Sequence, residues 1–165
     1  YALSKDRKIG MIQTKESSED IFNIGCIGKI NSFNETSDGR YVINLKGLNL
    51  FKIVKEVITE HKFRIYNVEI DNSKYFNLNK LDFDISILLN KFKVFFRNIK
   101  SDINFNTIEE INHSDLIKLI AMVCPFTVSE KQMLLESSDI SILAKNLIAL
   151  FDCYINQNDN EKTVN

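Results

Sequence analysis

The first seventy residues contain four runs in which apolar and polar positions alternate, with the two-residue period typical of β-strands. The longest run, residues 41–53, places one set of side chains on one side of a strand: Tyr41, Ile43, Leu45, Gly47, Asn49, Phe51 and Ile53. Shorter runs cover residues 8–13, 24–33 and 63–70. The polar turn 34–39 ends in Asp38-Gly39, a pair that favours a hairpin. We therefore predict a small, strongly curved antiparallel barrel or pseudo-barrel, with Gly47 on its inner side at a bend.

From residue 82 the apolar period changes to three or four residues, which predicts helices. The first begins at Asp82 and Asp84, and its apolar stripe is Ile85, Leu88, Leu89, Phe92, Phe95, Phe96 and Ile99. We expect the aromatic part of this stripe to pack against the barrel as core. Residues 107–110 match a capping box, and the next helix is predicted to run from Ser114 until Pro125 stops it.

Two more helices are predicted after the proline. Residues 129–132 match a second capping box, which would open a short helix ending near Ser137. Asp139 is the predicted cap of a long helix with the stripe Ile140, Leu143, Ala144, Leu147, Phe151 and Tyr154. Phe126, which follows the break at Pro125, is interpreted as a core residue that fixes the angle between two helices.

The 165 residues, 44% of them hydrophobic, suffice for one domain with a packed core. We divide the chain into a β part at residues 1–75, a helical part at 76–156 and a polar tail at 157–165. The net charge of −1 gives no electrostatic footprint for nucleic acid or a membrane. No apolar run is long enough to span a bilayer. Three widely spaced cysteines without a CxxC pair indicate reduced thiols in a cytoplasmic protein.

Candidate catalytic chemistry is weak throughout. The pair Gly28-Lys29 would need a glycine at Asn23 and a hydroxyl residue at Ile30 to form a phosphate loop. His61 and His113 are isolated, with no second histidine at a metal-binding spacing. No arrangement of nucleophile and base can be argued. We therefore predict no enzyme activity, no cofactor and no metal site.

Two blocks of sequence carry a family resemblance. The first holds a Gly-x-x-Gly strand, an Asp-Gly-Arg-Tyr turn and an Ile-x-Leu-x-Gly strand; the second holds Ala-Met-x-x-Pro-Phe followed by Glu-Lys-Gln and Leu-Leu-Glu. Their motif residues are Gly25, Gly28, Asp38, Gly39, Gly47, Pro125, Phe126, Glu130, Lys131 and Gln132. In this order and spacing, over residues 7–155, the chain resembles the N-terminal substrate-binding domain of Lon proteases in its stand-alone bacterial form.

The chain departs from that family at its start. The family usually opens with a Phe-Pro-Leu strand, a Pro-Gly turn and an Ile-Phe-Glu-x-Arg-Tyr segment, and these do not precede residue 8. We therefore expect an N-terminally truncated chain without the first barrel strand. The strand that should pair with it would keep unpaired backbone groups, so self-association through an open strand edge is expected. The candidate edges are residues 8–13 and 63–70.

The resemblance implies an α+β fold, with a PUA-like antiparallel pseudo-barrel followed by a small C-terminal helical bundle. It also implies a non-catalytic module that binds unfolded or tagged proteins in connection with proteolysis. The motif residues are interpreted as structural, so the residues that contact a bound protein are not identified. Two alternatives stay open. One is a PUA-like RNA-associated domain, against which the near-neutral charge speaks. The other is a fragment of a complete ATP-dependent Lon protease, against which the polar residues after Tyr154 speak.

Overall fold

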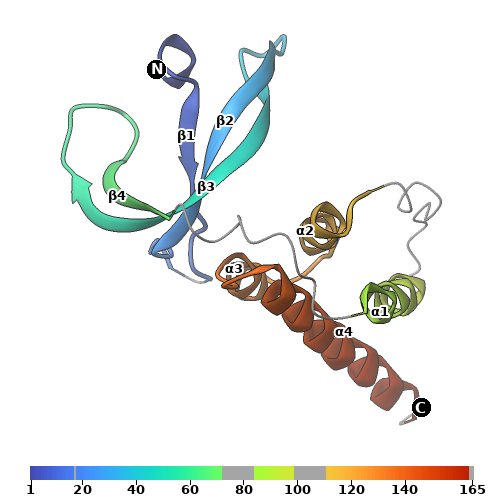
Figure 1. The fold of residues 1–165 in the computed structure, drawn as a ribbon. Coiled ribbons are helices and arrows are strands. Elements are labelled where there is room, and N and C mark those ends of the chain that lie inside the picture. Colours follow the sequence, from blue (N-terminus) through green and yellow to red (C-terminus); the bar gives the residue numbers. More distant parts are fainter. Residues whose placement is uncertain (17, 72–83, 99–110, 164–165) are drawn as a thin grey trace. The chain divides into compact units, whose positions relative to one another are not determined.

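A computed structural model of the protein describes residues 1–16, 18–71, 84–98 and 111–163, the last six of these by their backbone alone. The chain divides into two compact units, Tyr1–Lys74 and Tyr75–Asn165. The first is built on a sheet and the second on helices (Figure 1). An antiparallel sheet followed by helices confirms the predicted α+β class. Asp82, Ile99 and the predicted capping box at 107–110 lie outside the described residues.

The sheet unit holds four antiparallel strands in the order β1-β2-β3-β4. They are β1 (Lys8–Met11), β2 (Ile24–Glu35), β3 (Tyr41–Val57) and β4 (Ile65–Asp71), after a short 3₁₀ helix η1 (Ala2–Ser4). All four predicted strands are present, although β3 continues beyond Ile53. Within the described residues, β1 and β4 form the two edges of the sheet.

A bulge in β3 changes which residues share a side of the sheet. Ile27 pairs with Asn49, but the next residue, Gly28, pairs with Gly47, so Leu48 is an extra residue on β3. Alternation is interrupted there. The prediction that all the odd positions of 41–53 share one side was therefore wrong.

Cross-strand partners lie on the same side of a sheet, so the pairing defines its two sides. The aliphatic side, as we name it, carries Ile30 with its partner Leu45, and Leu50 with its partner Cys26. Tyr41 and Ile43 continue the same alternation and lie there too. The opposite side carries Phe51, Gly25 and Ile27. Leu50 and Phe51 are consecutive and both buried, one on each side.

Gly47 lies at an irregularity of β3, where the sequence predicts a bend. It does not have the buried, inner position that was expected. It lies beside the bulge residue, as a mid-strand glycine often does, and on the same side as Leu45. Contrary to the expected inner position, Gly47 is exposed. A Cβ at Gly47 would meet only the Cys26 Sγ atom, at an ordinary 3.5 Å.

The helical unit contains α1 (Ile85–Asn98), α2 (His113–Val123), α3 (Val128–Leu135) and α4 (Ile140–Thr163). Asp84 precedes α1, and its carboxylate accepts a hydrogen bond from the Ser86 amide at 2.9 Å. Asp139 caps α4 as predicted, accepting from the amides of Ser141 and Ile142. α4 continues past Asn156, where a polar tail was expected.

The core of the helical unit follows the predicted stripes. Its buried members are Leu88, Phe92, Phe95, Phe96, Leu116, Ile117, Ile120, Cys124, Phe126, Leu134, Ile140, Leu143, Ala144, Leu147 and Phe151. The ring of Phe95 lies 5.2 Å from that of Phe151 and 5.9 Å from that of Phe126. These ring contacts of the α1 stripe lie within the helical unit, and the packing of the stripe against the barrel stays a prediction.

Two helices begin earlier than predicted. The cap of α2 is Asn112, not Ser114, and its side chain accepts from the Asp115 amide at 3.0 Å. The capping box of α3 joins Thr127 to Glu130 and not Ser129 to Gln132. Both caps have extended backbone, as a residue just outside a helix requires.

Candidate protein-binding surface

The predicted motif residues of the helical unit meet at the break between α2 and α3. Pro125 and Phe126 occupy the break, and Phe126 is buried. Lys131 reaches back to donate to the Met122 carbonyl at 3.4 Å. Gln132, only 3% exposed, donates to a Glu136 carboxylate oxygen at 2.7 Å. The Lys131 bond joins α3 to the end of α2, whereas the Gln132 bond lies within α3 and its C-terminal cap, so both contacts are structural.

Glu130 is the polar centre of the same break. One of its carboxylate oxygens accepts from the Thr127 amide at 2.8 Å and from the Tyr154 hydroxyl at 2.9 Å. Partial burial opposes the charge, but the hydrogen bonds from Thr127 and Tyr154 lower the pKa of Glu130 below its ordinary value. Burial and the bond to Glu130 raise the pKa of Tyr154. The pair ties α3 to α4.

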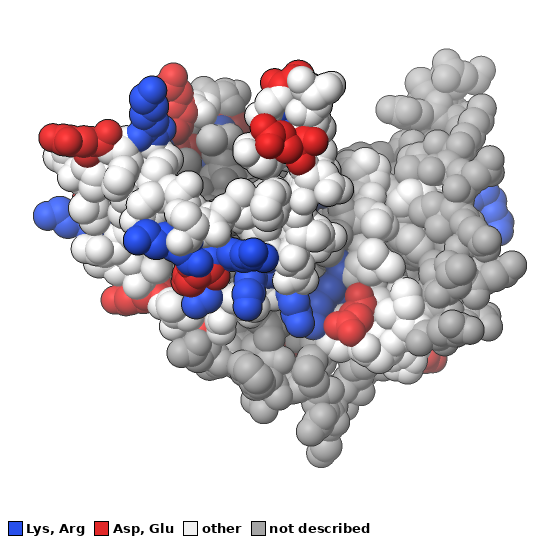
Figure 2. Space-filling view, turned by 90° about the horizontal axis from the view of Figure 1, so that it is seen from above, with Lys and Arg blue, Asp and Glu red and all other residues white. Residues whose placement is uncertain are grey.

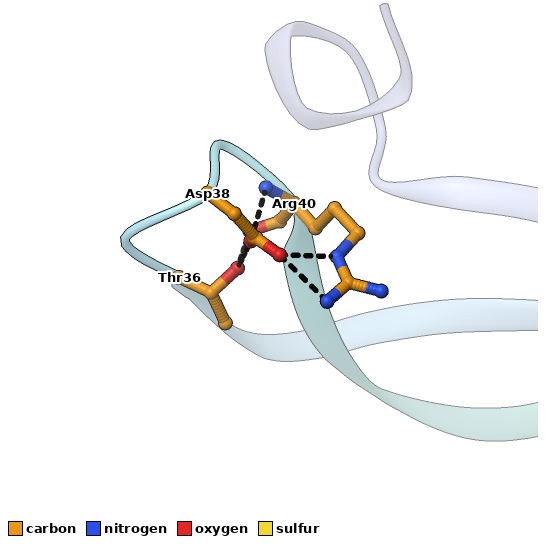
Figure 3. A network of polar contacts seen from close by, with 3 residues as sticks. All are labelled: Thr36, Asp38 and Arg40. Atoms are coloured by element: carbon orange, nitrogen blue, oxygen red, sulfur yellow. Dashed lines mark hydrogen bonds and ion pairs between the residues drawn. The ribbon is translucent and has the colours of Figure 1, made fainter.

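The motif residues Asp38 and Gly39 shape the β2–β3 turn (Figure 3). The Asp38 carboxylate accepts from the Arg40 guanidinium at 2.6 and 2.7 Å, and it contacts the Thr36 hydroxyl. The Arg40 and Thr36 hydrogen bonds lower the pKa of Asp38 to about 2. Gly39 has a φ of +79°, a left-handed conformation that favours glycine. These interactions define the backbone conformation of the turn that joins β2 to β3.

The outer part of this hairpin has no neighbouring strand within the described residues. β1 pairs with β2 only up to Lys29, and β4 pairs with β3 only from Leu50 onward. Beyond those points β2 and β3 pair with each other until their turn. Both strands and the turn that joins them are visible in Figure 1.

Three large apolar side chains lie on the aliphatic side of the outer hairpin. Phe33 is directly opposite Ile43, and the rings of Phe33 and Tyr41 are 6.0 Å apart. Their exposed fractions are 40% for Phe33, 51% for Tyr41 and 39% for Ile43. We name these three residues the hairpin patch. Contiguous exposed apolar side chains of this kind mark surfaces that bind another molecule.

A second candidate lies at the β3–β4 connection, where residues 56–59 and 61–64 line an open hollow of about 410 Å³. The rings of His61 and Phe63 stack at 4.9 Å, and the Tyr1 ring lies 5.3 Å from Phe63. Arg64 and Glu56 form a two-pronged ion pair at 2.8 and 2.9 Å across the connection. This pair satisfies the charges of Arg64 and Glu56, so the hollow offers aromatic contact together with the ammonium group of Lys62.

A third exposed apolar group lies on the helical unit. Leu119, Met122 and Val123 are exposed near the end of α2. They follow helical spacing and therefore share one side of that helix.

The described part of the chain bears on two kinds of chemistry, metal binding and cysteine reactivity. No group of three histidine, cysteine or acidic side chains could hold a metal ion there. Cys26 is half-buried, Cys124 buried and Cys153 exposed, and burial raises the pKa of Cys124 to about 12. A thiol so protonated is a poor nucleophile. Among the described helices, none has the length and apolar character to cross a membrane.

Sequence reasoning placed Tyr41 and Ile43 on the inner side of the sheet, and they do lie on the side that carries buried Ile30 and Leu50, but both are exposed. A usable signal was the length of the runs. Residues 24–33 and 41–53 alternate for longer than residues 8–13 and 63–70, so the neighbouring strands cannot cover the whole hairpin.

Comparison with known proteins places these features in a family. The sequence model described as the ATP-dependent protease La (LON) substrate-binding domain matches residues 1–152. Lon protease of Buchnera aphidicola subsp. Acyrthosiphon pisum is 28% identical over 99% of this chain and 22% of its own length. Lon protease 1 of Borreliella burgdorferi is 27% identical over 81% of this chain and 17% of its own length. The chain thus spans about a fifth of the length of these relatives.

Two solved structures share the fold. The N-terminal domain of a Lon protease from the Mycobacterium avium complex has a TM-score of 0.59 at 12% identity, covering 87% of this chain and 77% of that one. A Lon N-terminal domain protein from Xanthomonas campestris has a TM-score of 0.50 at 14% identity, covering 87% and 89%.

Proposed function

The chain belongs to the family of Lon substrate-binding domains, and on that premise we propose that it is a non-catalytic module that binds unfolded or tagged proteins. The observation that carries the proposal is the hairpin patch of Phe33, Tyr41 and Ile43, whose apolar side chains remain exposed although they continue the buried side of the sheet. The relatives are named as Lon proteases, which supports a link to proteolysis.

The size of the patch suits weak, general recognition. Completing the burial of a side chain that is about half exposed contributes on the order of 1 kcal/mol. The three side chains together would supply about 3 kcal/mol, roughly a hundredfold in affinity. Such a surface holds many unfolded segments without selecting one. Pairing of β2 with β3 supports this role, since the strands that carry the patch are already in place before binding and lose little conformational entropy.

Fluorescence anisotropy with a labelled, permanently unfolded protein tests the proposal. Replacing Phe33, Tyr41 and Ile43 together by serine should weaken binding by about a hundredfold. Serine at Met122 and Val123, the exposed group on α2, is the matched control and should leave binding unchanged. Urea unfolding of each variant checks that it is folded. Equal binding by the patch variant and the wild type would reject the hairpin patch, and loss in the control alone would move the surface to α2.

We further propose that this chain has no catalytic role of its own. The purified chain, incubated with casein with and without ATP, should release no peptides above background. ATP-stimulated release that disappears when one residue of the chain is replaced would contradict this. An RNA-associated function, the alternative kept from the sequence, would instead predict tight binding of an unstructured oligonucleotide.

Self-association and location complete the proposal. An open strand edge would pair with a second copy, and β1 and β4 are the candidates. Light scattering over a range of concentrations tests this, and a monomer at the highest concentration would argue against it. We propose a cytoplasmic location, which the unpaired cysteines support.

A further inference from the structure

Three lysines form a row across the sheet, on the side opposite the hairpin patch. Lys8 of β1 is the direct partner of Lys29 of β2, and Lys29 is the direct partner of Lys46 of β3. Direct partners share a side, so the three side chains leave the sheet together. Adjacent strands lie about 4.8 Å apart, so the row spans roughly 10 Å at right angles to the strands. All three lysines are exposed.

The row is electrostatically unfavourable as it stands, since like charges directly opposite each other repel. Lys8 has one counter-charge, the Asp6 carboxylate at 3.3 Å. For the ammonium groups of Lys29 and Lys46, the described part of the chain provides no ion pair. Figure 2 shows several Lys and Arg side chains near one another in the view, with an acidic side chain among them. An anion that binds between the two neighbouring ammonium groups is stabilised by both charges.

The surroundings of the row favour an acidic polypeptide over a nucleic acid. Proteins that hold single-stranded nucleic acid stack its bases on exposed aromatic rings. The exposed rings of the hairpin, Phe33 and Tyr41, lie on the other side of the sheet. Asp6, beside Lys8, opposes any incoming anion, and it opposes a phosphate backbone with a charge on every nucleotide more than a peptide with a few carboxylates. The chain as a whole carries a net charge of −1, which gives no long-range attraction for a polyanion.

The spacing also fits a polypeptide. Alternate side chains of an extended segment leave the same side about 6.6 Å apart. Two acidic residues at such positions, running along the row, would place their carboxylates within reach of the flexible lysine side chains.

We propose that the row of Lys8, Lys29 and Lys46 binds acidic stretches of the polypeptides that this domain captures. The inference rests on the proposed function and adds a substrate preference to it: unfolded segments that contain glutamate or aspartate at alternate positions bind more tightly than neutral ones. Asp6 limits that preference, because it competes with the incoming carboxylate for Lys8.

The test compares two labelled peptides that differ only in charge, one with glutamate and one with glutamine at alternate positions among the same apolar residues. With the full chain near 0.1 M salt, anisotropy should show the glutamate peptide binding about fivefold more tightly, as expected for two or three exposed ion pairs. Lys29→Gln and Lys46→Gln combined should bring the ratio close to one. Asp6→Asn should raise it, an effect that a merely structural role for the lysines would not produce.

Lys55→Gln is the matched control, because Lys55 is an exposed lysine of β3 whose partner is Asn67 and which is not in the row. If Lys55→Gln reduced the ratio as much as the row variants, the preference would reflect general charge and the row would be rejected. An equal affinity for both peptides would also reject the row but leave the proposed function intact. Failure of both peptides to bind would overturn the two together. Tighter binding of an oligonucleotide, lost in the row variants, would assign the row to nucleic acid.

Discussion

Replacing Gly25 by alanine is the sharpest test of how the sheet is packed. Gly25 is buried in β2, directly opposite Phe51 of β3. An added Cβ would lie 2.5 Å from the Met11 carbonyl oxygen and 2.6 Å from the Phe51 Cζ atom. Both distances are far below van der Waals contact. The first atom belongs to the backbone of β1, and the ring is 5% exposed with little room to withdraw.

The magnitude follows from two opposing effects. Forcing an extra carbon into a packed interior costs about 1–3 kcal/mol. Alanine in place of glycine inside a strand gains roughly 0.5–1 kcal/mol, because the unfolded chain loses freedom. Since one of the two clashing atoms is a backbone carbonyl, relief requires β1 to move. We therefore expect Gly25→Ala to lower the free energy of unfolding by about 2 kcal/mol net.

The assay is urea unfolding followed by circular dichroism, with Gly28→Ala as the matched control. At Gly28 the nearest atom to an added Cβ is a Leu45 methyl carbon at 3.5 Å, an ordinary contact. Alanine there should be neutral or slightly stabilising. If Gly25→Ala and Gly28→Ala differed by less than about 0.5 kcal/mol, the close approach of β1 and the ring to β2 would be refuted.

A double variant separates the two clashes. Phe51→Leu removes the end of the ring but leaves the Met11 carbonyl in place. If the ring supplies most of the strain, Gly25→Ala should cost at least 0.5 kcal/mol less in the Phe51→Leu background, which is a coupling of the size expected for residues in contact. An unchanged cost would assign the strain to the backbone of β1.

Three further outcomes are expected. Phe126→Ala should cost about 3–5 kcal/mol in urea unfolding, as for a buried aromatic, and a cost under about 1 kcal/mol would show an exposed ring. Thr127→Ala should cost about 1 kcal/mol through loss of the capping box, whereas Ser129→Ala, at the position where the sequence predicted the cap, should change little. Asp38→Asn should lower the free energy of unfolding at pH 5. Because the folded pKa of Asp38 is depressed and its contribution is lost on protonation, the difference in unfolding free energy from the wild type should vanish as the pH falls towards about 2. A difference that does not depend on pH would contradict this.

The elements were predictable because alternation and helical spacing are local properties of the chain. The positions of the caps were less so, since competing residues stood within two positions of each other. Ser129 and Gln132 have the right spacing for a box, but Gln132 is buried and donates to Glu136. Its side chain extends towards the end of the helix and not back to its start. Tertiary packing therefore decided between two equally plausible local motifs.

The sides of the sheet were harder still, because the bulge at Leu48 depends on pairing between strands and leaves no periodic trace. Gly47 signalled an irregularity without saying that the alternation would reverse. The motif glycines identified the hairpin correctly, yet the exposed residues beside them were hidden inside an apparently ordinary strand pattern. The residues of the family motif are those that the backbone conformation requires. The exposed surface depends instead on which parts of a strand have no neighbouring strand.

The two candidate surfaces have a joint consequence, since the hairpin patch and the lysine row lie on opposite sides of one sheet. Ile43 and Lys46 are close in sequence but point to different sides. A folded partner that presents one rigid face cannot contact both. An unfolded chain can, because a few extended residues at about 3.3 Å each suffice to pass around a strand. Once one segment is bound, the second is held at a high effective concentration, so the two weak contacts multiply in affinity. Placing modest surfaces on both sides of a thin sheet would therefore favour unfolded polypeptides over folded ones without any single strong site.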